Sequence, residues 1–186
     1  MNELQLSSPR LTLRLIKRSD LFSIHELHTV PEVDEFNTMG IPQNRAETES
    51  IVHAWIGAHQ LEEIRQYTLA IIEKASGDFI GIMGFNLVKA KYQRAEIWYK
   101  FYPRVWGQGL ATEAVKTMLN FGFDELQLHR IEAGCAVGNV GFIRVLEKVG
   151  MTREGHCRQA LPLKSGWSDN FEYAILASDK RPPIGS

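Results

Sequence analysis

Two glycines separated by one residue mark the part of this chain that is best suited to hold an anion. Gly107-Gln108-Gly109 leads into an apolar-periodic stretch that begins at Leu110, so the loop is expected to open a helix. Glycine lets the backbone approach a ligand closely, and the unpaired N–H groups of a first helical turn attract anions such as a diphosphate. Arg104 adds a cation, and no acidic residue lies between Arg104 and Thr112.

Other interpretations of this loop remain open on the residues alone. A pair of glycines also fits a loop that only turns the chain. A P-loop is excluded, because the required Gly-Lys-Ser/Thr is absent. The dinucleotide-binding fingerprint is weak, because Thr112 stands where a third glycine or alanine belongs, although Glu132 lies about where a ribose-binding acid is expected.

The elements that position this loop alternate between strands and helices. Helical periodicity and capping residues predict a short helix after Asp20 and longer helices after Asn44, Gly109 and Asn139. Strand patterns occur at 11–15, 67–72, 79–88, 95–101, 130–137, 152–160 and 167–176. This order predicts an α/β (α+β) fold, a mixed sheet with helices on both faces.

Composition limits the class of protein. The chain has 186 residues, of which 44% are apolar and 23% charged, so we expect a single domain over 1–186. The tail from 178 to 186 has no periodic pattern and is expected to be frayed. A net charge of −1 gives no support to nucleic-acid binding. Residues 1–9 lack a hydrophobic signal core, and no apolar run is long enough for a membrane span.

Cysteine and histidine usage argues against a metal site. Cys135 and Cys157 form no zinc-like or redox pair, so free thiols and a cytoplasmic location are expected. His25-x-x-His28 has no further ligands at a plausible spacing, and we therefore expect no metal. The basic run 89–94 is interpreted as a solvated loop, with contact to an acceptor or to a cofactor phosphate as the alternative.

One motif and its surroundings are similar to a known family. Arg104-x-x-Gly107-x-Gly109-x-Ala111 resembles the Arg/Gln-x-x-Gly-x-Gly/Ala signature of the GNAT acetyltransferase superfamily. The wider sequence resembles the branch that contains the ribosomal-protein N-terminal acetyltransferases (RimJ/RimL-like), in segments 8–14, 95–97, 106–114, 129–133, 144–151 and 173–176 and at Asn139 and Asp169. The resemblance spans roughly residues 8 to 177, the expected core of the domain.

The resemblance implies a fold and a co-substrate, acetyl-CoA. The implied GNAT fold is a mixed sheet of six or seven strands that splays between its central parallel strands, with the pantetheine arm in the splay. Asn139 is implied as a cofactor contact, and it also suits the N-cap of the following helix. The strand and loop residues implied in cofactor binding are Tyr99, Lys100, Phe101, Arg104, Trp106, Gly107, Gln108, Gly109, Leu110, Ala111 and Thr112.

The implied reaction is attack of a neutral amine on a thioester. It needs a deprotonated amine, a stabilised oxyanion and a protonated thiolate. By resemblance, Glu96 stands where histone-type members hold the general base, and a solvated carboxylate or an anchor for the acceptor amine is the alternative. The oxyanion donor is implied to be a backbone N–H on the strand that carries Tyr99 and Lys100.

The chain departs from the branch at two positions. Phe142 stands where the branch usually has a serine that contacts CoA and protonates the thiolate, so a serine-mediated mechanism is excluded there and Phe142 is expected in the core. Trp98 replaces a glycine and is expected to pack or to reshape the acceptor cleft. Cys135 and Tyr173 are alternative acids, although each fits the core better.

The favoured acceptor is a protein or peptide N-terminal α-amine, such as that of a ribosomal protein. Freeing an α-amine of pKa about 8 at neutral pH costs less than about 1 kcal/mol, whereas a lysine amine costs about 4 kcal/mol. A small amine (an amino acid, a polyamine or an aminoglycoside) and a CoA-binding module without catalysis remain as alternatives. The acceptor cleft is implied to come from residues 20–65 and the closing strands, in a monomer or homodimer.

Overall fold

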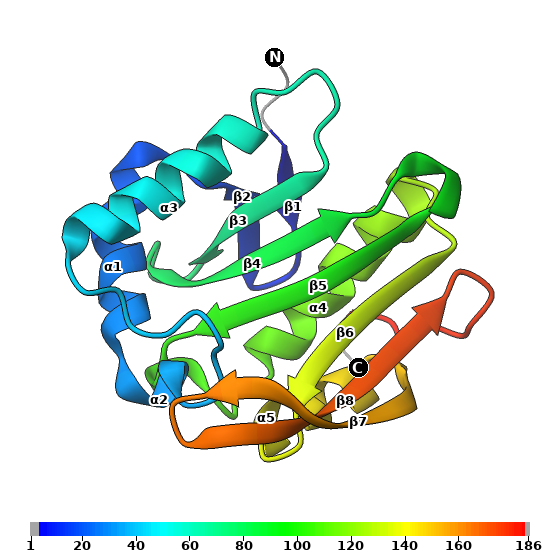
Figure 1. The fold of residues 1–186 in the computed structure, drawn as a ribbon. Helices are drawn as coiled ribbons and strands as arrows, with labels where there is room; N and C mark the ends of the chain where they lie inside the picture. The colour runs from blue at the N-terminus through cyan, green and yellow to red at the C-terminus, as the bar shows by residue number, and fades with distance from the viewer. Residues whose placement is uncertain (1–3, 185–186) are drawn as a thin grey trace.

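The protein forms one mixed sheet with helices packed on both faces (Figure 1). The computed structural model describes residues 4–184. The strand order is β1-β2-β3-β4-β5-β6-β8-β7. The strands are β1 (Gln5–Ser7), β2 (Leu11–Leu15), β3 (Gln66–Glu73), β4 (Phe79–Leu87), β5 (Arg94–Phe101), β6 (Arg130–Ala136), β7 (Thr152–Leu163) and β8 (Gly166–Leu176).

The helices divide between the two faces of the sheet. One face carries α1 (Leu21–Thr29), α2 (Pro31–Asp34) and α3 (Arg45–Ala58), and the other carries α4 (Leu110–Asn120) and α5 (Val140–Lys148) (Figure 1). The expected mixed sheet with helices on both faces is thereby confirmed. It has eight strands, one more than the upper number expected, because β1 folds back on β2 through the pairs Gln5↔Arg14 to Ser7↔Thr12.

The sheet splays between β5 and β6, its parallel pair. These strands pair only from Arg94↔Arg130 to Glu96↔Glu132, so their later residues lie apart. Figure 1 shows β5 and β6 side by side at their starts and separated at their arrowheads. The remaining strand pairs are antiparallel. Where β5 and β6 diverge, backbone groups inside the sheet face no neighbouring strand.

Strand β5 sends alternate side chains to opposite faces. Ile97, Tyr99 and Phe101 pack in the core beneath α4 and α5, whereas Trp98 packs in a second core with α1 and α3. The backbone alternates too. Tyr102 N–H donates to Ile80 O at 3.0 Å, so even-numbered residues of β5 bond to β4. The N–H and C=O groups of residues 97, 99 and 101 therefore face the splay.

The expected frayed tail is wrong for most of its described residues. Arg181 donates to Asp124 at 2.8 Å and to Asn120 at 3.0 Å, and its guanidinium lies 5.2 Å from the ring centre of Phe123. Lys116 Nζ donates to Pro183 O at 2.7 Å. The tail lies against the end of α4 because a cation there meets carboxylate, amide and aromatic partners. The last two residues, 185–186, lie outside the described part of the chain.

Within residues 4–184, no helix is long and apolar enough to cross a membrane.

Candidate active site

The loop before α4 has the geometry of an anion site. Gly107 and Gly109 adopt φ of +75° and +76°, a region that favours glycine, and a Cβ on Gly107 would meet open space. Gly109 is the N-cap of α4 and offers no side chain to the helix end. Glu113 N–H is bonded back to Gly109 O at 3.0 Å, so the N–H groups of residues 110–112 point out of the helix end. This arrangement suits a diphosphate.

An ion pair between a buried carboxylate and a half-exposed arginine fixes this loop to the start of the chain. Glu113 is 6% exposed and accepts bonds from Ser8 Oγ at 2.7 Å, Arg10 N at 2.8 Å and Arg10 Nε at 2.6 Å. Burial raises the pKa of Glu113, but the bonds from Ser8 and Arg10 outweigh it and hold the pKa below its usual value. Arg10 also donates to Gln108 O at 2.9 Å, which places a guanidinium beside the two glycines. Sequence analysis missed Arg10, because only the fold brings 10 and 108 together.

The other polar residues of the loop lie differently from expectation. Arg104 donates to Phe79 O at 3.2 Å and stacks over the Tyr102 ring at 4.6 Å, so its guanidinium is directed to the end of β4. Its expected pairing with a phosphate stays a prediction. Gln108 Nε2 donates to Arg104 O at 3.0 Å, and Trp106 Nε1 donates to Phe101 O at 3.0 Å. These bonds hold the shape of the loop, and the Trp106 bond occupies the Phe101 carbonyl at the edge of the splay.

Aromatic side chains line the α5 side of the splay. Tyr99 and Phe142 stack with ring centres 4.4 Å apart and planes 13° from parallel. Burial raises the pKa of the Tyr99 phenol, and its hydroxyl has no hydrogen-bond partner among the described residues. Phe142 packs against the core, as expected. The ring of Phe142 lies where the branch has a serine, and the unpartnered hydroxyl nearby belongs to Tyr99 of the facing strand.

Asn139 caps a helix and the two alternative acids, Cys135 and Tyr173, lie in the core, as the sequence predicts. Asn139 Oδ1 accepts a bond from Phe142 N–H at 3.1 Å, which confirms its N-cap role, whereas its contact with the cofactor stays a prediction. Burial raises the pKa of the Cys135 thiol to about 11. Tyr173 is buried, and its hydroxyl lies 3.4 Å from Glu147 Oε1. Neither Cys135 nor Tyr173 is therefore poised to give up a proton.

Glu96 lies at the apex of the splay, in the last pair that joins β5 to β6. Partial burial raises the pKa of Glu96, and the negative charge of Glu132 opposite adds to the effect. Glu132 is held by Arg130 Nε at 2.7 Å and by Arg94 at 3.4 Å. Glu96 is exposed and its pKa is raised, which suits a proton acceptor, whereas the carboxylate of Glu132 is engaged by two arginines.

Trp98 packs rather than lining an open cleft. Its ring lies 5.8 Å from the ring of Trp55 in α3. A Cβ on Gly84, the β4 residue paired with Trp98, would overlap the indole, so the indole lies flat over a residue that has no side chain. Tryptophan at this position fits because its β4 neighbour is glycine.

Lys100 departs from expectation. As an even-numbered residue of β5 it directs its backbone to β4 and its side chain to the α1 face, away from the predicted cofactor position. Burial lowers the pKa of Lys100 to about 8, and the charge of Asp34 opposes this shift. Burial also lowers the pKa of His28 to about 3, and the charges of Lys100 and His25 lower it further. His25 Nδ1 bonds Thr48 Oγ1 at 2.8 Å. These residues form a buried polar group with no evident structural purpose.

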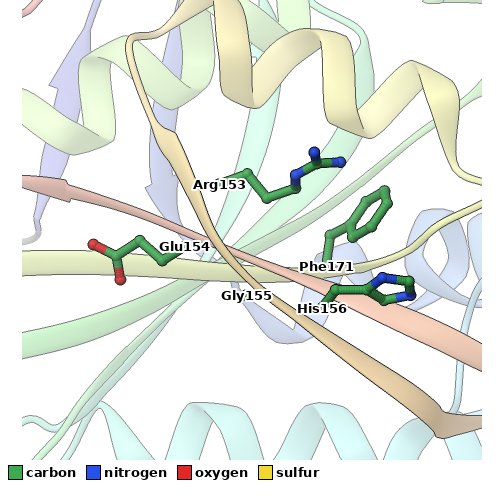
Figure 2. A pocket seen from close by; sticks show the side chains of 5 residues that line it. All are labelled: Arg153, Glu154, Gly155, His156 and Phe171. Atoms are coloured by element: carbon green, nitrogen blue, oxygen red, sulfur yellow. The ribbon is translucent and has the colours of Figure 1, made fainter.

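The closing hairpin β7–β8 carries an open hollow of about 340 Å³ lined by Arg153, Glu154, Gly155, His156 and Phe171 (Figure 2). The Arg153 guanidinium lies 4.5 Å from the centre of the Phe171 ring, and Figure 2 shows both side chains on one side of the hairpin. His156 Nε2 lies 2.7 Å from Asp169 Oδ2. The hollow therefore offers a cation and an aromatic ring beside the fold's closing strands.

Comparison with known proteins gives a consistent result. The sequence model described as "Acetyltransferase (GNAT) domain" matches residues 10–152. The "Probable N-acetyltransferase YjcK" of Bacillus subtilis is 36% identical over 121 residues, which make up 64% of this chain and 67% of that protein.

Two solved structures share the fold. An acetyltransferase of the GNAT family from Bacillus anthracis is 28% identical and has a TM-score of 0.83, covering 95% of this chain and 100% of that one. Spermidine N-acetyltransferase from Vibrio cholerae, solved in complex with CoA and spermine, is 23% identical and has a TM-score of 0.81, covering 92% of this chain and 98% of that one.

Proposed function

The chain belongs to the acetyltransferase (GNAT) domain family, and on that premise we propose that it acetylates the N-terminal α-amine of a protein or peptide. Membership makes the chain an acetyl-CoA-dependent N-acyltransferase. The finer assignment, to the branch of ribosomal-protein N-terminal acetyltransferases, rests on the motif segments around residues 96, 107–114 and 144–151. Two free cysteines suit a cytoplasmic location, which is part of the proposal.

The observation that carries the proposal is the placement of the glycine loop beside the splay. The N–H groups of residues 110–112 point out of α4, and Arg10 lies beside the same loop. From there the free edge of β5 leads toward Glu96, with the backbone of Tyr99 facing the splay. In this proposal the loop supplies amides for a diphosphate, the free edge of β5 supplies partners for the pantetheine amides, and Glu96 supplies a carboxylate near the apex.

In the proposed reaction, Glu96 accepts a proton from the acceptor amine. The amine nitrogen then attacks the thioester carbon, a C–N bond forms, the C–S bond breaks and the thiolate leaves and is protonated. We propose the backbone N–H of Tyr99, which faces the splay between those of Ile97 and Phe101, as the donor that stabilises the oxyanion. Partial burial keeps Glu96 basic enough to share the proton.

A polyamine is the second candidate acceptor. Similarity in fold to the Vibrio cholerae spermidine N-acetyltransferase favours it, as does the facing pair Glu96 and Glu132, which offers negative charge to a polycation. A thiol-release assay over N-terminal peptides, amino acids and polyamines separates the two candidates. Peptides should give the highest kcat/KM, and a clear preference for spermidine would transfer the proposal to the second candidate.

Cofactor binding is tested separately by the change Gly109→Trp. A tryptophan at φ +76° strains the loop and fills the helix end, so calorimetry with CoA should show binding weakened by about a hundredfold or more. Gly77→Trp is the matched control, since Gly77 has φ +78° and open space around it in the β3–β4 turn. Normal CoA affinity in Gly109→Trp would refute the loop assignment.

A further inference from the structure

The starting observation is a set of buried polar atoms without hydrogen-bond partners. Among residues 4–184 these include Lys100 Nζ and both ring nitrogens of His28. His28 is 2% exposed. Buried polar atoms in folded proteins nearly always have partners, so an unpartnered cation and an unpartnered imidazole call for a specific explanation.

The two side chains belong to one region of the fold. His28 packs against Trp55 with ring centres 6.0 Å apart, and Trp55 packs against Trp98 at 5.8 Å. Trp98 and Lys100 share a face of β5, because side chains two residues apart point the same way. The region therefore joins α1, α3 and β5 on the face opposite α4.

Packing alone does not explain a lysine at this position. Burying an unpaired ammonium is strongly unfavourable, and an apolar side chain of the same length would fill the space without that penalty. Asp34 is 5% exposed and supplies an opposite charge nearby, but the hydrogen bond of its carboxylate is to Asn37 Nδ2, at 3.3 Å. Lys100 Nζ therefore keeps donors that no described residue satisfies, and the atom is closed off from solvent in this structure.

The position of Lys100 relates this region to the reaction. Its neighbour Tyr99 turns its backbone to the splay, and Glu96 lies four residues earlier on the same face of β5. Because α4 delivers the cofactor from the opposite face, the acceptor has to approach on the face of Glu96 and Lys100. Phe36, in the segment after α2, lies against Gly138, shortly before α5. Because Lys100 Nζ and His28 are closed off from solvent, binding of an acceptor there requires a neighbouring segment to move.

We infer that Lys100 and His28 form an acceptor subsite that binds an oxygen atom next to the reacting amine. This inference rests on the proposed function. The oxygen is the carbonyl of an N-terminal residue or the carboxylate of a free amino acid, since both place a hydrogen-bond acceptor three bonds from the amine nitrogen, across the α-carbon. The ammonium of Lys100 and one N–H of neutral His28 donate to it.

The charges along β5 agree with such an acceptor. Glu96 and Lys100 lie about 13 Å apart along β5, so their long side chains have to reach toward each other over Trp98 for one acceptor to place its amine near Glu96 and its oxygen near Lys100. A polyamine lacks the oxygen and would bring a second ammonium toward Lys100. The subsite thus selects against polyamines, although the fold is shared with a spermidine N-acetyltransferase.

The experiment compares three acceptors that share one side chain. They are a peptide that begins with phenylalanine, free phenylalanine and phenethylamine, which lacks the carbonyl group, and spermidine serves as a fourth. We expect kcat/KM to be higher by about tenfold or more for an acceptor that carries the oxygen than for phenethylamine. The ranking of peptide against free phenylalanine identifies the source of the oxygen.

Lys100→Met keeps the length of the side chain and removes its donors. We expect the ratio between the oxygen-bearing acceptor and phenethylamine to fall by about tenfold, mainly through KM, with partial recovery in Lys100→Arg. His28→Phe should lower the same ratio by less, because it removes one neutral donor. Lys164→Met, in the exposed turn of the β7–β8 hairpin, is the matched control and should leave the ratio as it is.

Three outcomes would overturn the inference. An equal loss for all acceptors in Lys100→Met would make Lys100 a structural residue. A preference of the wild-type protein for phenethylamine or spermidine would also overturn the inference. That result needs no variant, so it decides the question even if a variant fails to fold. Normal CoA binding without thiol release in the presence of any amine tested would overturn the proposed function together with the subsite.

Discussion

The two faces of the sheet are built in opposite ways. Beneath α4 and α5 lies one large apolar cluster, and the buried carboxylate there, Glu113, accepts three hydrogen bonds. On the face of α1 and α3 the apolar cluster is smaller, and among residues 4–184 the buried polar atoms without partners include those of His28, Thr68, Asn86, Arg94 Nε and Lys100, whose side chains belong to this face. Tyr99 Oη is the exception that belongs to the other face.

We call the face of α4 and α5 the frame and the face of α1 and α3 the working surface. Satisfied polar groups hold the glycine loop in one conformation, which suits a cofactor that is the same in every turnover. Unsatisfied groups lower stability, and a chain keeps them where a ligand supplies the missing partner. The comparison predicts that substitutions on the α4 face weaken the protein, whereas substitutions on the other face stabilise it and weaken catalysis.

The largest effect is expected at Glu113. Glu113→Ala leaves Ser8 and Arg10 without their shared partner, and the free energy of unfolding should fall by about 3–5 kcal/mol in urea denaturation. Because the pKa of Glu113 is lowered in the folded state, its contribution is present above the unfolded pKa and is lost as the pH falls through the folded pKa. Glu47→Ala is the control, because it removes the exposed carboxylate that accepts a bond from Gln43 N–H at the start of α3, and it should lose about 1 kcal/mol. If the free energy of unfolding fell no more in Glu113→Ala than in Glu47→Ala, the stabilising role of the α4 face would be contradicted.

The next effect has the opposite sign. Lys100→Met should raise the free energy of unfolding by about 3 kcal/mol at pH 7, because the folded-state pKa of Lys100 is lowered from 10.5 to about 8. Below pH 8 the lysine is charged in both states and its burial penalty is complete. Between pH 8 and 10.5 the folded protein loses the proton first, so wild-type stability rises and the difference between the proteins disappears.

Denaturation curves of both proteins from pH 7 to pH 10.5 measure this convergence. A variant that is less stable than the wild type at pH 7 would show that Lys100 is a structural residue, and it would remove the distinction between the two faces.

The smallest of the three effects tests the apex of the splay. Glu96→Gln keeps the shape and removes the basic group, so kcat/KM near neutral pH should fall by about a hundredfold. The loss should shrink at high pH, where the amine is already neutral, and should be smaller for an α-amine than for a lysine amine. CoA affinity should hardly change.

Glu132→Gln sharpens the same test. It removes the negative charge that helps to raise the pKa of Glu96, so the rise of kcat/KM with pH should move to lower pH while the base is retained. An unchanged kcat/KM in Glu96→Gln at pH 7 would mean that the proton leaves through water or another group.

Local patterns were sufficient for the glycine loop and the helix caps, and insufficient for contacts between distant parts of the sequence on either face. The glycine loop, the helix that follows it and the cap at Asn139 depend on neighbouring residues, and sequence analysis predicted them. The contact between Arg10 and Glu113 joins residues 103 positions apart, and no local signal announces it.

Sequence analysis also could not predict which β5 residues face the splay and which face β4. Lys100 was expected as a backbone contact of the cofactor, but which edge and which face a strand residue uses depends on its register with β4. The tail was expected to be frayed because Arg181 finds Asp124 only in the folded chain. In both cases the deciding partner comes from a distant part of the sequence.

The contact of Trp98 with Gly84 also restricts the order in which these two residues can have arisen. An indole at 98 in this orientation occupies the space that any Cβ at 84 would need, so the orientation requires glycine at 84. Glycine at 84, in contrast, is compatible with a small residue at 98. A history that leads from a small residue at 98 to this chain, with the indole in this orientation throughout, therefore passes through glycine first, and the way back to a side chain at 84 stays closed until the tryptophan has been replaced or reoriented.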